Sequence, residues 1–516
     1  MLHHHARRLI AGAGLAGTLV AVTAMPASAH RAPADIDIYL GASTVAAGRP
    51  GVETSPILFA SEPVSLDGLT VSFDSTALAG VATVAGAEGE DCTAATPARL
   101  VCTRAFPVEL REGGVGGVFD VVITAAPGAK AGDTGTLRVT LAAKGVKPIT
   151  TQARVRVAEG IDLAAGASIT ANARPGGSFE APMTVRNAGR ATVRGATVLF
   201  FNDYAFQARG SFRNCTYVEG QVRSCTFDQA LAPGTAYRLG VPYQLRKDTA
   251  APGGAFGESQ WLTPAERDDF TEYLDQFGYT LGTPGTGGTL KLTRTGQARA
   301  QAVPQTDVDP DNNWTNIEVD VRGKQGSDLS AVGDEVSGEA GATVEATVGV
   351  RNLGPATIDW NRSGEVIARV DVAVPAGSTV VTVPDGCRQV VGGAVDWDAP
   401  VQPGARAYRC ESGSVFQAGT SETFRFGLRI DEVVPNAAGV VAVNNPCECP
   451  QFDKDLDRGN NRAALVVNPT AGDGGQGGGL PVTGPAGTAV AVGGLLLLFV
   501  GGGSVFLARR RTRFVA

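Results

Sequence analysis

Apolar and polar residues alternate with a period of two in several widely separated parts of the chain. Clear examples are residues 137–141, 317–321 and 424–430. Because successive side chains of a β-strand point to opposite faces, this alternation predicts strands with one buried face. Glycine and proline residues separate these short runs, as is typical of turns. The pattern therefore predicts an all-β chain built of antiparallel β-sandwich domains.

One segment has helical spacing instead. Residues 263–266 read Thr-Pro-Ala-Glu, which is a capping box with proline at the first helical position. Four apolar residues then recur at i, i+3, i+4 and i+7: Phe270, Tyr273, Leu274 and Phe277. We expect a helix over 264–277, within an insertion at about 252–288. Its apolar face could cover a sheet edge or core flank, or form a binding insert.

An internal repeat divides the chain. The sequence Val-Arg-Asn-Ala-Gly at 185–189 returns as Val-Arg-Asn-Leu-Gly at 350–354, a domain-sized offset of about 165 residues. We therefore expect a second domain at 159–322, which holds the insertion, and a third at 323–468. Residues 30–158 would form a more divergent first domain.

The N-terminus has the features of a secretory signal. Arg7 and Arg8 precede an apolar run, and an Ala27-Ser28-Ala29 cleavage site follows it. The mature chain would begin at His30, after a signal peptide at 1–29. The alternative is an uncleaved membrane helix, for which the apolar run is short.

The C-terminus carries three signals in order. After a glycine-rich linker at 469–479 comes a five-residue motif, then an apolar stretch at 486–508 that is long enough to span a membrane, then a basic tail at 509–516. The motif consists of Leu480, Pro481, Val482, Thr483 and Gly484, and the tail arginines are Arg509, Arg510, Arg511 and Arg513. By the positive-inside rule the tail stays in the cytoplasm. This order resembles the sortase (LPxTG) sorting signal of Gram-positive cell-wall surface proteins.

The resemblance implies a covalent route to the wall. A sortase cysteine would attack the Thr483 carbonyl, release the chain from Gly484 onward and pass Thr483 to an amine of the peptidoglycan precursor. The apolar stretch would then be only a transient transmembrane helix. The alternative is a single-pass membrane protein that keeps its tail.

A second resemblance covers residues 160–468. Asn-Leu-Gly-Pro-Ala at 352–356, Val-Pro-Ala-Gly at 374–377, a cysteine pair and a closing Asn-Asn segment look like the bacterial surface repeat of unknown function. That resemblance implies tandem immunoglobulin-like sandwiches displayed on wall-anchored proteins.

All eight cysteines lie in the exported part, where disulfides are favoured. Cys92 and Cys102 have the same spacing as Cys215 and Cys225, which predicts two local bridges. The remaining cysteines, Cys387, Cys410, Cys447 and Cys449, allow three pairings. We prefer Cys387–Cys410, with Cys447 and Cys449 as a tight pair. Metal binding or redox chemistry by the Cys-x-Cys pair is the alternative.

Acidic clusters close the second and third domains. Their aspartates are Asp307, Asp309 and Asp311 in one, and Asp453, Asp455 and Asp457 in the other. Alternating carboxylates can converge on Ca²⁺, so these six aspartates are candidate calcium ligands; no cofactor is expected to be required. The alternative is a turn in which the carboxylates bond to nearby backbone.

Charge and composition exclude several functions. Without Arg7, Arg8 and the four tail arginines, 38 basic residues face all 51 acidic ones, a formal charge of −13. Such a surface argues against nucleic acid as a partner. The four histidines are His3, His4, His5 and His30. Only His30 remains once the signal is removed, so most histidine-dependent catalysis is excluded.

These features predict a non-enzymatic, wall-anchored surface protein. Its ectodomain would be a structural spacer or an adhesive module. The alternative is an adhesin that binds a specific extracellular protein or glycan through its second domain. A wall-bound glycoside hydrolase, which needs only paired carboxylates, is the third hypothesis.

Overall fold

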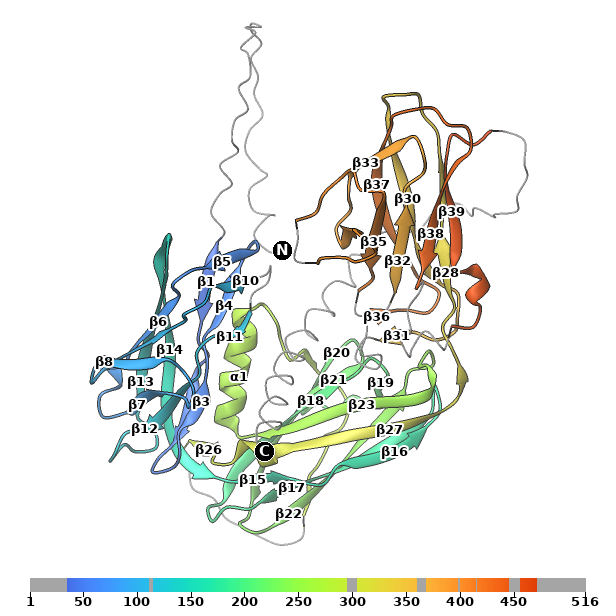
Figure 1. Cartoon of the computed structure of the whole chain (residues 1–516). Helices are drawn as coiled ribbons and strands as arrows, with labels where there is room; N and C mark the ends of the chain where they lie inside the picture. The colour runs from blue at the N-terminus through green and yellow to red at the C-terminus, as the bar shows by residue number, and fades with distance from the viewer. Residues whose placement is uncertain are drawn as a thin grey trace, which may run out of the picture.

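A computed structural model describes residues 35–110, 115–294, 304–359, 368–397, 400–413, 415–444 and 455–470. Three β-sandwich domains follow one another along the chain, and one α-helix interrupts them. Domain 2 lies across the base in Figure 1, with domains 1 and 3 at its two ends. The predicted all-β fold is confirmed.

Domain 2 consists of two facing sheets. The larger has the order β16 (Ile169–Ala173), β27 (Trp314–Gln325), β23 (Ala251–Leu262), β18 (Val193–Asn202), β21 (Gln221–Leu231), β20 (Cys215–Val218) and β24 (Thr283–Pro284). The smaller has the order β15 (Leu163–Ala165), β17 (Ser178–Asn187), β22 (Ala236–Leu245) and β19 (Phe206–Ala208), with β25 (Thr293–Arg294) also on β22. Trp261, Tyr237 and Tyr243 fill the space between them. This is an immunoglobulin-like sandwich.

Domain 3 repeats this arrangement. Its larger sheet has the order β29 (Asp334–Val336), β39 (Arg462–Val467), β38 (Ala437–Val443), β32 (Arg369–Ala373), β35 (Ala407–Glu411) and β34 (Cys387–Gln389). Its smaller sheet has the order β28 (Leu329–Val332), β30 (Thr343–Asn352), β37 (Ser421–Ile430) and β33 (Ser378–Thr382), and a short pair joins β31 (Ile358–Asp359) to β36 (Val415–Phe416). The internal repeat is therefore a structural repeat.

Domain 1 has the same larger sheet. The order is β2 (Ser43–Ala46), β14 (Val146–Ile161), β13 (Thr134–Ala143), β6 (Thr70–Asp74), β9 (Arg99–Thr103) and β8 (Cys92–Thr96). Strand for strand this matches the order from β16 to β20 and from β29 to β34. The first domain is thus a third copy with the same topology.

The smaller sheet of domain 1 is broken into pieces. One piece joins β1 (Ile36–Tyr39), β4 (Ile57–Ala60) and β11 (Val115–Gly117), and another joins β3 (Val52–Thr54), β12 (Val121–Ala125) and β7 (Ala82–Gly86). A hairpin-like pair, β5 (Val64–Leu66) and β10 (Val108–Leu110), lies beside them. Pro56 separates β3 from β4 because proline has no N–H to give to a ladder.

The prediction of purely antiparallel sheets is wrong in several pairs. In each larger sheet, the second strand of the domain runs parallel to its last strand, in the pairs β2–β14, β16–β27 and β29–β39. The end of β14 also pairs in parallel with β26 (Gln305–Asp307).

The predicted start of the insertion is also wrong. Residues 252–262 belong to β23, which lies between β18 and β27 in the sheet of domain 2. Close packing accounts for Gly257, because a Cβ there would lie 2.3 Å from Oδ1 of the buried Asn202. The domain boundaries also shift by a few residues, since β14 continues to Ile161 and β27 to Gln325.

Three predicted disulfides are present. Cys92–Cys102 joins β8 to β9, Cys215–Cys225 joins β20 to β21, and Cys387–Cys410 joins β34 to β35. Each bridge therefore occupies the same place in its domain, at the edge hairpin of the larger sheet. Cys447 and Cys449 lie outside the described residues.

Other predictions also fall outside the described residues. These are the signal peptide with its cleavage residues Ala27, Ala29 and His30, the sorting motif at 480–484, the apolar stretch and the arginine tail. Within the part that the structure describes, no helix is both long enough and apolar enough to cross a membrane.

Candidate functional site: the two domain junctions

The first acidic cluster folds back onto the beginning of domain 2. It follows β26 (Gln305–Asp307) and forms the 3₁₀ helix η2 (Pro310–Asn313). The Asp307 carboxylate accepts hydrogen bonds from the backbone N–H of Leu163, at 2.6 Å, and of Asp309, at 2.8 Å. Asn312 donates to Asp162 and to Asp309. The loop thus ties the last strand of the domain to its first.

The second acidic cluster does the same for domain 3, around the 3₁₀ helix η4 (Arg458–Asn460). The Asp455 carboxylate accepts from the backbone N–H of Leu329, at 3.3 Å, and of Asp457, at 3.4 Å. Asn460 donates to Asp328, as Asn312 does to Asp162. We name residues 307–313 and 455–461 the acidic loops, because they are equivalent in the two domains.

Two of the predicted calcium ligands, Asp307 and Asp455, therefore already accept hydrogen bonds from backbone N–H groups. Asp457 caps η4 by accepting from Gly459 N–H, Asp311 is exposed, and Asp453 lies outside the described residues. Among the residues that the structure describes, no three His, Cys, Asp or Glu side chains are grouped to hold a metal ion. Calcium binding stays a prediction.

Asp307 has a perturbed acidity. Its side chain is only 4% exposed, and burial raises the pKa of this carboxyl to about 7. The negative charge of Glu266 raises it further, while the N–H groups of Asp309 and Leu163 lower it. A carboxyl that changes charge near neutral pH thus lies at the boundary between domains 1 and 2.

The predicted helix is present as α1 (Pro264–Gln276). Thr263 and Glu266 form the expected capping box, and Gly278 lies just beyond the C-cap with φ of +71°. Glu266 also accepts from Asp307 N–H at 2.6 Å and from Thr306 Oγ1 at 2.7 Å. The capping residue of the helix therefore holds the acidic loop of its own domain.

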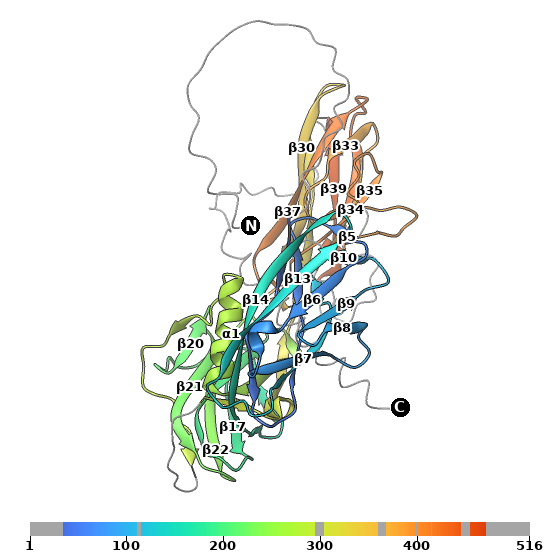
Figure 2. The same cartoon turned by 90° about the vertical axis from the view of Figure 1, so that its left-hand side faces the viewer.

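The apolar face of α1 packs on domain 1. The Phe277 ring lies 4.8 Å from that of Phe59 and 5.4 Å from that of Tyr39, and Tyr273 lies 5.8 Å from Tyr39. Figures 1 and 2 show α1 alongside domain 1. Of the two alternatives for this face, the structure shows packing against a core flank, and that flank belongs to the neighbouring domain.

Charged groups surround the aromatic contact. Asp269 of α1 forms salt bridges with Arg154 at 3.3 Å and Arg156 at 3.1 Å, both on β14. It also accepts a hydrogen bond from Thr44 of β2. The linker itself is minimal, since only Asp162 separates β14 from β15, and β26 pairs with the end of β14. Sequence analysis missed this interface, because its partners lie more than a hundred residues apart.

The junction between domains 2 and 3 is polar. Thr357 N–H donates to the Asp248 carbonyl at 2.7 Å, and Tyr204 N–H donates to the Asp359 carboxylate at 2.7 Å. The Tyr204 hydroxyl donates to the Asp248 carboxylate at 2.9 Å, and the Arg246 guanidinium stacks on the Tyr204 ring. This junction is held by hydrogen bonds rather than by apolar rings.

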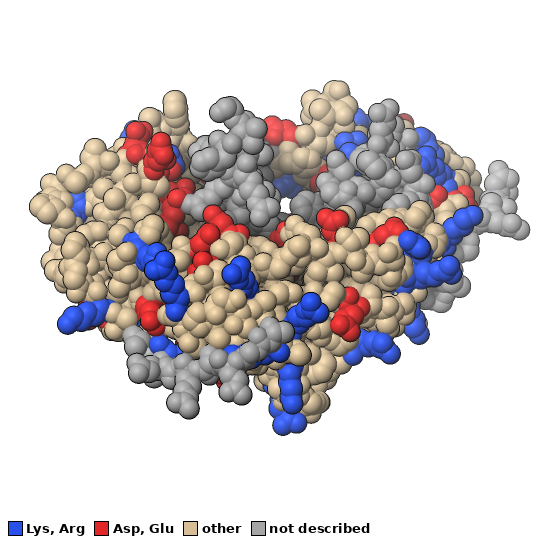
Figure 3. Space-filling view, turned by 90° about the horizontal axis from the view of Figure 1, so that it is seen from below, with Lys and Arg blue, Asp and Glu red and all other residues tan. Residues whose placement is uncertain are grey.

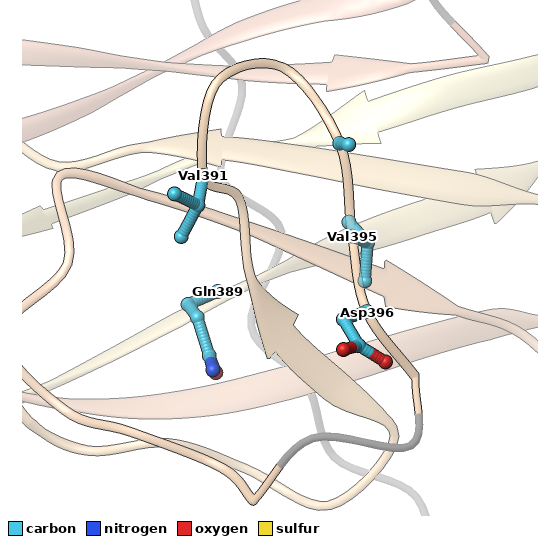
Figure 4. A pocket seen from close by; sticks show the side chains of 5 residues that line it. Gln389, Val391, Val395 and Asp396 are labelled. Atoms are coloured by element: carbon cyan, nitrogen blue, oxygen red, sulfur yellow. The ribbon is translucent and has the colours of Figure 1, made fainter.

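Two surface cavities bear on the hydrolase hypothesis. One, of about 250 Å³, lies inside the hairpin between β34 and β35, with Val391, Val395 and Asp396 on its walls (Figure 4). The other, of about 280 Å³, lies at the first junction and includes Arg156 and Asp268. Each has a single carboxylate, so neither contains the acid pair that the hydrolase hypothesis requires.

The underside of the molecule shows how charge is distributed. Lys and Arg side chains are spread across this face, with Asp and Glu side chains between them (Figure 3). The negative charge of the whole chain is thus not gathered on this face.

No family model and no curated protein matches the chain. Among solved structures, the chain is similar to Dpr2 Ig1-Ig2 in complex with DIP-Theta Ig1-Ig3, with 7% identity, coverage of 84% of this chain and 100% of that one, and a TM-score of 0.20. It is also similar to the I-band fragment I67-I69 from titin, with 9% identity, coverage of 85% and 99%, and a TM-score of 0.15. These low scores carry no argument about function.

Proposed function

We propose that the chain is a secreted spacer that sortase attaches to peptidoglycan through Thr483, and that it holds domain 1 away from the wall without catalysing a reaction. Location at the cell wall is supported by the order of the predicted segments: signal peptide, ectodomain, sorting motif, apolar stretch and arginine tail. The three disulfides suit an oxidising compartment outside the cell.

The observation that carries the spacer role is the first junction. A one-residue linker, a shared strand pair and a helix packed across the boundary restrict the two domains to one arrangement. A tether that only needed length could join its domains by glycine-rich linkers, which are flexible, and would not need a helix packed across a boundary.

The same observation weakens the adhesin alternative in its predicted form. The helix offered the clearest apolar surface for a ligand, but its Tyr273 and Phe277 rings contact domain 1. A ligand for domain 2 would have to use another surface.

Wall attachment is tested by replacing the acyl donor. In a sortase-positive Gram-positive host, Thr483→Ala is expected to move the chain from the fraction released by wall-digesting enzymes to the membrane fraction. Thr470→Ala, a matched change of an exposed threonine near the start of the linker, is the control and should leave wall release unchanged. Equal wall release by Thr483→Ala would contradict sortase anchoring.

A further inference from the structure

The edge hairpins of the three domains are protected differently. In domain 2, β24 pairs with β20 and covers the edge. In domain 3, β34 has three residues and includes Arg388. In domain 1, β8 has five residues, and none is charged or proline. Short length, charge, proline and added strands are the usual means of protecting an edge.

Strand β8 is also accessible. Residues Thr93 to Thr96 are all exposed, and in the part that the structure describes they form no hydrogen bond outside the pairing with β9. Figures 1 and 2 both place β8 on the outer rim of domain 1. Nothing described in domains 2 or 3 pairs with it.

The disulfide identifies which backbone groups face outward. The Cα atoms of Cys92 and Cys102 are only 4.0 Å apart, the spacing of a non-hydrogen-bonded antiparallel pair. Residues in such pairs direct their N–H and C=O away from the partner strand. Because the two kinds of pair alternate along a ladder, Ala94 opposite Leu100 is also a non-hydrogen-bonded pair, and its N–H and C=O point away from β9. The Cys92 N–H donates to the Glu90 carbonyl. The outward-facing N–H and C=O of Ala94 form no hydrogen bond with any described residue.

The register shift in β8 does not remove these groups. It lies between Ala94 and Thr96, beside the turn that leads into β9. The stretch from Cys92 to Ala94 therefore keeps regular strand pairing, and its small side chains leave the edge sterically open.

The charges at the two ends of β8 indicate which strand can pair with it. Asp91 precedes the strand and Arg99 follows its turn, and both are exposed. Arg99 also lies opposite Asp74 where β9 pairs with β6. Antiparallel pairing of two β8 strands about Ala94 brings Asp91 of each copy near the turn that carries Arg99 of the other. The strand is thus complementary to itself in charge as well as in backbone.

We infer that β8 of domain 1 pairs with β8 of a second copy of this chain, in an antiparallel two-fold contact centred on Ala94. The two Ala94 residues exchange N–H to C=O hydrogen bonds across the axis. One short strand pair makes a weak contact, which many copies on one surface strengthen through avidity. The inference does not depend on wall anchoring, since it concerns the chain in solution.

Sedimentation of the full-length chain in mild detergent tests the contact. The wild-type chain is expected to show a reversible, concentration-dependent dimer. Ala94→Pro removes the outward N–H and should weaken the dimer at least about tenfold. Ala94→Val keeps the N–H at the same position and should retain it.

Charge reversal gives a test that does not involve backbone changes. Asp91→Arg alone should weaken the dimer several-fold, more so at low salt, and adding Arg99→Asp should restore it. Near-UV circular dichroism checks that each variant is folded. A wild-type chain that stays monomeric at all concentrations, a dimer unaffected by Ala94→Pro, or a double variant without recovery would each overturn the inference.

Discussion

Both domain junctions place an acidic loop against the first strand of the following domain, but only the first junction adds a helix. Asp307 and Asp455 make equivalent bonds to backbone N–H groups. At the first junction α1 then covers the boundary with aromatic rings and salt bridges, whereas the second relies on Tyr204, Asp248 and Thr357. The acidic loop is therefore a feature that domains 2 and 3 share. The helix is found in domain 2, where it makes the boundary with domain 1 apolar.

The largest expected difference concerns the two aspartates. Asp307→Ala leaves the buried Leu163 N–H and the part-buried Asp309 N–H without this acceptor, and should lower the free energy of unfolding by about 3 kcal/mol. Asp455→Ala removes longer bonds at a half-buried site and should cost about 1 kcal/mol. Calorimetry of the two variants measures the difference, and equal losses would mean that burial does not distinguish the loops.

The dependence of stability on pH should report on Asp307, whose pKa is raised. Because the pKa of Asp307 is raised in the folded state, its ionisation opposes folding, so stability should fall as pH rises from about 4 to about 7, by on the order of 2 kcal/mol. Asp307→Asn should flatten this part of the profile. Denaturant midpoints across that range provide the measurement, and a variant that keeps the wild-type slope would assign the effect to another group.

Removal of one ring should open the first junction alone. Phe277→Ala loses contacts with Phe59 and Tyr39 and should weaken docking of α1 by about 1.5 kcal/mol. Distances between spin labels on domains 1 and 2 should broaden, while those between domains 2 and 3 stay narrow. Phe106→Ala, at a side chain that is 81% exposed, is the control and should change neither distance.

The smallest expected effect lies at the second junction. Tyr204→Phe removes the hydroxyl that donates to Asp248 but keeps the ring under Arg246. We expect a loss of less than about 1 kcal/mol, because the backbone bonds of Thr357 and Tyr204 remain. The same pair of spin-label distances measures it, and a wide opening between domains 2 and 3 would show that the hydroxyl is essential there.

Local signals predicted local structure well. The capping box at Thr263 and Glu266 correctly predicted the start of α1. The shared cysteine spacing predicted two of the bridges, and the preferred pairing of Cys387 with Cys410 is the third. The target of the helix could not be predicted, since Tyr39 and Phe59 lie more than two hundred residues away in sequence. The glycine-rich start of β23 read as a loop because only packing against Asn202 explains Gly257. The aspartates were singled out correctly, but their pattern fits a cation and a backbone turn equally well.

The parallel pairing of an early strand with the last strand of each domain has a mechanical consequence. If the chain is held at its C-terminal end, as proposed, and pulled at its N-terminal end, the two strands of each pair, such as β16 and β27, are drawn in opposite directions along their length. Such loading shears the hydrogen bonds between them together instead of opening them one at a time. The disulfide hairpins lie at the opposite edge of each sheet, outside this load path. Each domain is therefore arranged to resist tension with its backbone ladder.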